Sequence, residues 1–352
     1  MKILRAETRV FGVAVISAVL LLTAARLSEE NLKAQEIGES GRKVEISDTL
    51  HRVVFDRGAF YGASTPVPQW GNGYLVSREI ETTEAGAANV RIYDRLGNKV
   101  NEASIWFPGS QRVIVYSAMA TADGRIIASG HAEKMNGTAA PFIALTDLAG
   151  KVTEVLQTKR FIPVNTCQAP DGTVWSFGAM GYDENSQPKP GDMLRHFDFQ
   201  KGEIGSYLPR STFPKQLHPG PEVRAYIHCT EQEVLAYSIS AGEFMEIKYD
   251  NDSPHLYCVE APAGLRLVGF ATTSAGEVFG HFSHSGQNGL YYLALNEAAK
   301  TARWRPVEGT TGSHTKPGVI TALWGSDGDK LVVGRAEDRA GTVALHWVTP
   351  TE

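Results

Sequence analysis

The feature that most restricts the fold of this chain is a repeat of about fifty residues. Each copy has a tight turn before a β-rich run, as at Asp123-Gly124 and Asp171-Gly172. Asp-Gly between apolar runs is a hairpin signal because glycine tolerates the positive φ that such turns need. A second, polar turn interrupts a later strand, and it recurs at spacings of 53, 51, 52 and 46 residues, at Asp94, Asp147, Asp198, Asp250 and Asn296. Four short strands per repeat are typical of a β-propeller blade.

The length of the repeat region predicts the number of blades. Lys43 to Val348 is 306 residues, or 51 for each of six blades. The last copy has no fourth strand after Val343–Val348, and Gly41–Ile46 is similar to Gly150–Val152 and its neighbours. We therefore predict an all-β, six-bladed β-propeller over residues 36–352, with four-stranded blades and the last blade closed by the N-terminal strand, which removes a free edge. No long 3.6-residue periodicity follows residue 36, which disfavours a helical solenoid.

One segment carries a family resemblance. Ala169-Pro-Asp-Gly-Thr-Val-Trp175 is similar to the signature of periplasmic sensor propellers, and it occurs once in that form. The chain resembles the six-bladed propellers of bacterial exported proteins, including NHL-like and TolB-like repeats, over nearly its whole length after residue 36. The resemblance implies a fold and brings no catalytic residues with it.

The N-terminus has the pattern of an export signal. Lys2, Arg5 and Arg9 precede an uncharged, mostly apolar run of 16 residues from Val10 to Ala25, shorter than a comfortable membrane span. We expect residues 1–35 to be a signal peptide or an uncleaved N-terminal anchor with a linker. Both alternatives place the domain in the periplasm or outside the cell.

The three cysteines are Cys167, Cys229 and Cys258. An oxidising compartment permits a disulfide, but an odd number leaves one thiol over. Cys229 and Cys258 are expected on the inner and outer strands of one blade, too far apart to bond easily. The sequence therefore predicts no essential disulfide.

The charge of the chain disfavours a nucleic-acid partner. The formal net charge is −5, and without residues 1–34 the remainder has 29 Lys and Arg against 36 Asp and Glu. A general nucleic-acid binder needs a basic surface. We expect an anionic small molecule or a protein as the partner, and contact with a membrane only through an uncleaved N-terminal segment.

The lengths of the connections predict which face is used for binding. Turns from the first to the second strand of each blade are tight, whereas the connections at the opposite face are long, including His131–Pro141, Gly178–Asp192, Pro209–Glu222 and His281–Gly289. Function concentrates on loops held by a rigid scaffold, and long loops are rarely kept without use. We expect ligands at this long-loop face.

An arginine begins four successive inner strands, at Arg112, Arg160, Arg224 and Arg266. Four guanidinium groups at the mouth of a channel would favour a carboxylate or phosphate ligand, such as an acidic sugar, because the forked donors of arginine match those groups. The alternative is that each arginine pairs with a local carboxylate. Asn165 and His228 are expected deeper on inner strands, where they would contact a ligand or channel water.

Catalytic and metal-binding signals are weak. His281 and His284 would supply two metal ligands if their loop curls, but no carboxylate lies close to them in sequence. No nucleophile or phosphate-loop motif is present, so we expect no cofactor beyond a possible divalent cation. The predicted function is an exported binding propeller. The alternative is a metal-dependent lactonase, lyase or hydrolase with its site at the central channel, for which the chain offers Asn165 but few inner-strand acids.

Overall fold

The computed structural model describes residues 42–46, 51–54, 68–181, 189–209, 225–239, 242–339 and 342–351. Residues 43–351 form one compact unit. The N-terminal export segment and Arg224 lie outside the described residues, and so do residues 182–188 and 210–222 of the predicted loops Gly178–Asp192 and Pro209–Glu222. No helix among the described residues is long and apolar enough to span a membrane.

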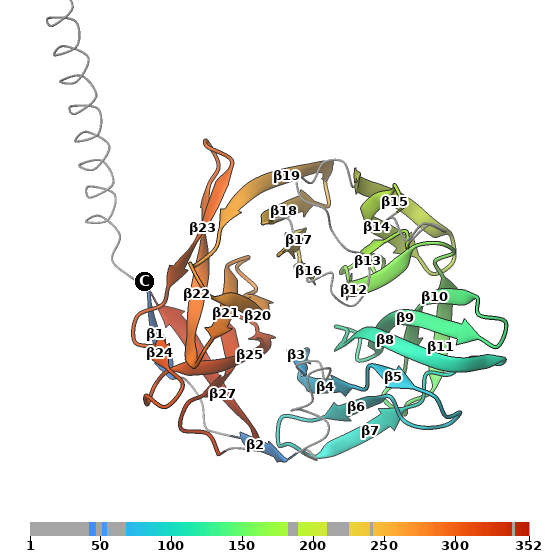
Figure 1. Ribbon diagram of the computed structural model, residues 1–352, viewed down its shortest axis with the longest axis horizontal. Coiled ribbons are helices and arrows are strands. Elements are labelled where there is room, and N and C mark those ends of the chain that lie inside the picture. Colours follow the sequence, from blue (N-terminus) through green and yellow to red (C-terminus); the bar gives the residue numbers. More distant parts are fainter. Residues whose placement is uncertain are drawn as a thin grey trace, which may run out of the picture. The chain divides into compact units, whose positions relative to one another are not determined.

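The described residues form an all-β, propeller-like fold made of successive antiparallel sheets (Figure 1). Within the hydrogen-bonded sheets, antiparallel groups of strands start at an inner strand and run outward in chain order, and each such group is called a sheet below. These groups include β3(Gln69–Gly71)-β4(Tyr74–Arg78)-β6(Val90–Tyr93)-β7(Lys99–Ala103), β8(Ser110–Ala120)-β9(Ile126–Lys134)-β10(Ala139–Thr146)-β11(Val152–Gln157), β12(Ile162–Gln168)-β13(Val174–Ala179)-β14(Asp192–Asp198)-β15(Gly202–Pro209) and β16(Ala225–Cys229)-β17(Glu233–Ser238)-β18(Glu243–Lys248)-β19(Asn251–Glu260).

The remaining strands include β1, which comes from the N-terminal end of the unit. The next group is β20(Arg266–Thr272)-β21(Val278–His284)-β22(Gln287–Asn296)-β23(Thr301–Pro306), whose outer strand β23 pairs in parallel with β19. The last group is β25(Ile320–Asp327)-β26(Lys330–Arg335)-β27(Thr342–Thr351)-β1(Lys43–Ile46). Three short strands lie beside these sheets: β2(His51–Val54) pairs with β27, β5(Glu81–Thr82) with β8, and β24(Gly312–Ser313) with β22. β1 pairs antiparallel with β27, the strand most distant from it in the sequence.

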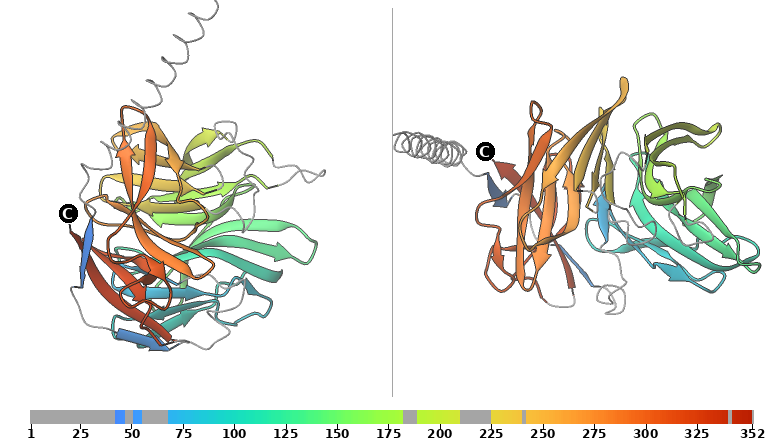
Figure 2. Two further views of the ribbon diagram at one scale, coloured as in Figure 1. Left: turned by 60° about the vertical axis from the view of Figure 1, so that its left-hand side comes forward. Right: turned by 45° about the horizontal axis from the view of Figure 1, so that its top comes forward.

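The sheets pack against one another face to face (Figure 2). One apolar cluster joins Ile92 of β6 to Val113 of β8, and another joins Trp175 of β13 to Met245 of β18. Successive side chains of a strand point to opposite faces of its sheet. Each sheet therefore buries apolar side chains on both faces, one face against each neighbouring sheet. The inner strands β25 and β3 also pair in parallel at Gly325 and Trp70, which joins the last sheet to the first.

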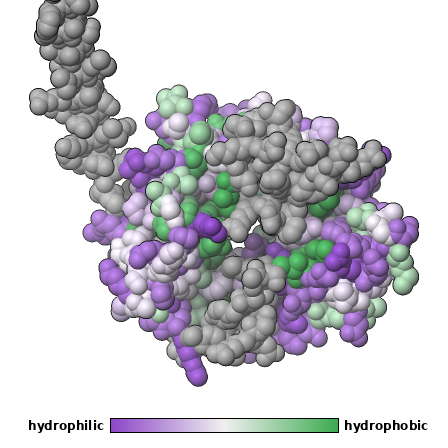
Figure 3. All heavy atoms as spheres, viewed as in Figure 1, coloured by the Kyte–Doolittle hydropathy of each residue, from purple (hydrophilic) through white to green (hydrophobic). Residues whose placement is uncertain are grey.

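Several tryptophans contribute to this packing. Trp175 and Trp347 are fully buried, and Trp70 packs edge-on against Trp347 with ring centroids 5.2 Å apart. The guanidinium of Arg95 lies 4.5 Å from the Trp347 ring centroid. On the visible face of the unit, hydrophobic residues form small separate patches among hydrophilic ones (Figure 3).

Two connections expected to be long loops are instead tight turns between extended strands. β9 continues to Lys134 and β10 starts at Ala139, so His131–Pro141 is mostly hairpin. β21 continues to His284 and β22 starts at Gln287, which leaves only Ser285 and Gly286 between them. Both turn residues have positive φ, 50° and 83°, as a two-residue hairpin of this type requires. The ends of these strands carry polar residues, so the sequence pattern there resembles that of a loop.

Candidate functional site

A central cavity lies at one end of the inner strands. Its volume is about 480 Å³, within the range of small-molecule sites. The inner strands form its walls, and the tight turns that follow them form its rim, at Asn72, Asp123, Gly172, Glu231, Ser274 and Gly328. The described lining residues therefore belong to the tight-turn end, whereas the sequence pointed to the opposite, long-loop end as the binding face.

Threonine ends three of the inner strands and fixes the turns of the rim. The Thr230 hydroxyl donates to the Glu233 carbonyl at 3.0 Å and accepts the Glu233 amide at 3.0 Å. The hydroxyls of Thr121 and Thr273 accept amides of their own turns in the same way, at 3.1 and 3.2 Å. A hydroxyl that satisfies backbone groups locally is the reason that threonine favours turns. The rim is therefore built from short, internally bonded segments.

Asn165 is one of the two polar residues that the sequence placed on inner strands, and it lines this cavity. A β-bulge in β12 lies between Pro163 and Asn165 and turns the strand locally. The Asn165 amide Nδ2 donates to the Ala225 carbonyl of β16 in the next sheet. Its Oδ1 has no hydrogen-bond partner among the described residues, so it is an available acceptor.

His228 is the second of these residues, and it also lines the cavity. It lies two positions after Tyr226 on β16, and this period of two gives both side chains the same face. The imidazole has no hydrogen-bond partner in the part of the chain that the structure describes. Burial lowers the pKa of His228 to about 4, because a desolvated site disfavours the charged imidazolium. At neutral pH the ring therefore offers one donor and one acceptor.

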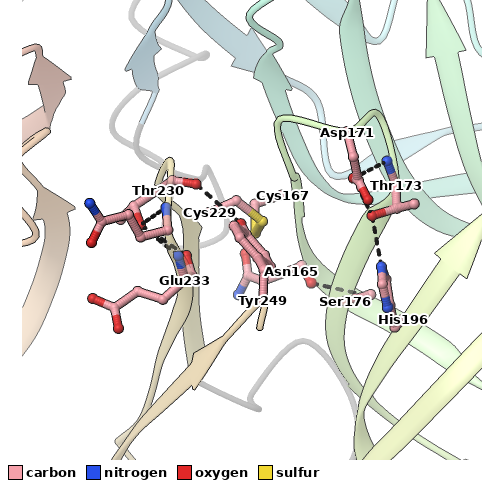
Figure 4. The surroundings of a disulfide bond; sticks show 11 residues. Asn165, Cys167, Asp171, Thr173, Ser176, His196, Cys229, Thr230, Glu233 and Tyr249 are labelled. Carbon is pink, nitrogen blue, oxygen red and sulfur yellow. Dashed lines mark hydrogen bonds between the residues drawn. A yellow bond between two sulfur atoms is a disulfide. The ribbon is translucent and has the colours of Figure 1, made fainter. Parts of the chain in front are cut away.

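A disulfide joins the two strands that carry these residues (Figure 4). Cys167 of β12 and Cys229 of β16 are bonded, with their Cα atoms 5.5 Å apart and a separation of 62 positions in the sequence. The prediction of no essential disulfide did not anticipate this bond. It compared Cys229 with Cys258 in the same sheet, whereas the bonded pair comes from neighbouring sheets, whose inner strands approach each other. Cys258 is free and exposed. The disulfide hints at an oxidising compartment.

Further bonds between neighbouring inner strands reinforce the cavity wall. The Ser326 hydroxyl donates to the Thr272 carbonyl at 2.7 Å, and Asn72 Nδ2 donates to the Ala120 carbonyl at 2.9 Å. Tyr249, which packs beside the disulfide, donates its hydroxyl to the Thr230 carbonyl at 3.1 Å (Figure 4). Burial raises the pKa of Tyr249, so this donor keeps its proton. Ser326 and Asn72 thus bond across from one sheet to the next, whereas Tyr249 bonds within its own sheet.

The predicted arginine cluster lies elsewhere. None of the described arginines of that set, Arg112, Arg160 and Arg266, is among the cavity-lining residues. Arg112 donates to both carboxylate oxygens of Glu133, at 2.6 and 2.9 Å, and to Glu81 at 3.3 Å. Arg112 thus makes the local carboxylate pair that was the alternative interpretation. An anion site at that end stays a prediction.

The Arg112 pair continues inward as a buried chain of polar groups. Glu133 lies 3.4 Å from His131 Nε2, and His131 Nδ1 lies 3.0 Å from the Tyr116 hydroxyl. Burial lowers the pKa of His131 and raises that of Tyr116 to about 12. These shifts keep both groups neutral, so the chain of polar groups is suited to structural hydrogen bonding between β8 and β9 within one sheet.

The histidines proposed for a metal do not converge. His281 and His284 both lie on β21 and are three positions apart, so strand alternation points them to opposite faces. His281 is buried, which lowers its pKa to about 4, whereas His284 is exposed. Among the described residues no group of three or more His, Cys, Asp or Glu is placed to hold a metal ion.

Two aromatic residues of the cavity were missed by the sequence analysis. Tyr226 of β16 and Phe270 of β20 line the cavity from neighbouring inner strands and stack with ring centroids 5.5 Å apart and an interplanar angle of 17°. The period-two relation of Tyr226 to His228 was a signal that was available. The pairing of Tyr226 with Phe270 was not, because it depends on how two sheets pack.

Comparisons with known proteins give no family. No family model and no curated protein sequence matches this chain. Solved structures that resemble it include U3-55K (9% identity, 85% of this chain and 98% of the other, TM-score 0.47), a luciferin-regenerating enzyme (13%, 89% and 96%, 0.44) and the WD40 β-propeller domain of Doa1 (8%, 87% and 97%, 0.44). At these TM-scores the likenesses carry no functional argument, and the fold assignment above rests on the strand pairing.

Proposed function

We propose that the chain is an exported six-bladed β-propeller that binds a small molecule in its central cavity. In this proposal β1 closes the last blade, and the propeller works in the periplasm or outside the cell. The export-like N-terminus and the Cys167–Cys229 disulfide both support that location.

One observation carries the binding role. The cavity wall contains an imidazole, His228, that is half-buried, lines the cavity and is bonded to none of the described residues. A polar group that faces a cavity without a protein partner is satisfied there by water, an ion or a ligand. The disulfide and the Asn165–Ala225 hydrogen bond fix the two strands around this ring, as a preorganised site requires.

The test is thermal unfolding of the full chain against a panel of neutral sugars, organic acids, phosphates, amines and divalent metals. A ligand at 100 times its dissociation constant adds about 2.7 kcal/mol to the free energy of unfolding. We expect at least one compound to raise the melting temperature of the native protein and of the Arg112→Ala control, and to have little effect on His228→Ala.

The outcomes separate the alternatives. Stabilisation by a ligand that persists in His228→Ala but disappears in Arg112→Ala would move the site to the long-loop end and contradict the proposal. Stabilisation by a divalent metal alone, lost in His228→Ala and Asn165→Ala, would favour a metal site in the cavity.

A further inference from the structure

The charges of the cavity lining restrict the ligand. Three acidic residues, Asp123, Glu231 and Asp327, line it, and no lysine or arginine is among its described lining residues. Asp123 is bonded to Arg125 at 2.6 Å, and Asp327 accepts the Trp347 indole N–H at 2.8 Å. An anion entering this cavity would lose water and meet no cation to replace it. The lining therefore disfavours anionic ligands.

The neutral polar groups of the lining match hydroxyl groups. Gln168 donates from Nε2 to the Gly172 carbonyl at 3.2 Å, which leaves its Oε1 as an acceptor. Together with Asn165 Oδ1 and the neutral His228 ring, this set provides several acceptors and one donor on neighbouring strands. A hydroxyl group both donates and accepts, so one ligand hydroxyl can satisfy either kind of partner.

The aromatic pair adds a flat apolar surface. Tyr226 and Phe270 are half-buried, stack on each other and line the cavity beside the polar groups. Ligand sites commonly combine aromatic walls with a few polar groups that fix orientation. A ring with an apolar face and polar edges fits such a wall better than an extended chain does.

We propose that the cavity binds an uncharged, hydroxyl-rich ring, that is, a neutral carbohydrate. Its hydroxyls bond to His228, Asn165 and Gln168, and its ring packs on the Tyr226–Phe270 pair. This inference rests on the proposed function and names the ligand class of the same site.

The experiment compares matched ligands that differ only in charge. Glucose, galactose and mannose are titrated into the full chain by calorimetry, beside their uronic acids and their 2-amino sugars, at neutral pH. We expect at least one neutral sugar to bind at least tenfold tighter than its uronate and its amine, with binding lost in His228→Ala. A uronate or amine that binds more tightly than its neutral partner overturns the inference of a neutral ligand, while the proposed binding of a small molecule in the cavity stays in place.

Two variants sharpen the result. Phe270→Leu keeps an apolar side chain but removes the ring, and we expect it to weaken the neutral sugar by about fivefold. Phe107→Leu is the control, since Phe107 packs on Phe142 outside the cavity lining. Gln168→Lys adds a cation to the lining, and we expect it to shift preference toward the uronate.

Two further outcomes of the sugar titrations would overturn the inference. If none of the nine sugars binds, the carbohydrate class is overturned. The proposed function is then tested separately by the wider panel of compounds in the thermal-unfolding experiment. Neutral-sugar binding that is unchanged in both His228→Ala and Phe270→Leu places the sugar outside the cavity and overturns the inference.

Discussion

The two ends of the inner strands differ in the kind of bonds that hold neighbouring strands together. At the tight-turn end, neighbouring sheets are joined by a disulfide and by neutral side-chain to backbone bonds, and the described lining has no basic residue. At the other end, Arg112 of β8, Glu133 of β9 and Glu81 of β5 form a half-exposed charged group. Where inner strands converge, neutral and covalent links avoid the cost of burying a charge, whereas a half-exposed pair keeps part of its hydration.

The largest expected difference between the two ends comes from the disulfide. Closing a loop of 62 residues restricts the unfolded chain, so Cys167→Ser with Cys229→Ser should cost about 4 kcal/mol in the free energy of unfolding. Urea unfolding of the full chain under oxidising conditions measures this cost. Cys258→Ser, which removes the free and exposed thiol, is the matched control and should change little. A double variant as stable as the native chain would show that the neutral bonds alone hold this end.

A smaller loss is expected at the junction of the last and first sheets. Gly325 has φ +152°, and a Cβ there would lie 2.1 Å from the Trp70 carbonyl oxygen. Gly325→Ala should therefore push β25 from β3 and cost about 2 to 3 kcal/mol. Gly71→Ala, in the facing strand, is the control because its new Cβ would have no neighbour closer than 3.7 Å. Equal melting temperatures for the two variants would mean that the junction adjusts freely.

The smallest effect is expected at the charged end. A double-mutant cycle between Arg112→Gln and Glu133→Gln should give a coupling of about 1 kcal/mol or less, because water screens half-exposed pairs. The hydrogen bond from Arg112 lowers the pKa of Glu133 below its ordinary 4.5. The pair therefore stabilises the fold above pH 4.5, and this contribution is lost as the pH falls through the lower folded value. Coupling that survives 1 M salt, or that grows as the pH falls, would contradict this account.

The repeat explains why the fold could be predicted from the sequence. Turn signals such as Asp123-Gly124 act locally, and their even spacing restricts the chain to short strands in successive sheets. The repeat also placed His228 on an inner strand, and this strand lines the cavity. The two hairpins at Asn136-Gly137 and Ser285-Gly286 were missed because their strands carry polar residues and look like loops.

The sequence by itself determined the order of strands and turns, since these depend on residues a few positions apart. Tertiary structure alone decided that Cys167 bonds to Cys229, that Tyr226 stacks on Phe270, and that Arg112 pairs with Glu133. The first two contacts join neighbouring sheets, and the third joins strands whose pairing register is shifted by bulges. Such contacts depend on how neighbouring sheets approach each other and on the pairing register of the strands. A local pattern of residues determines neither the approach of the sheets nor the register.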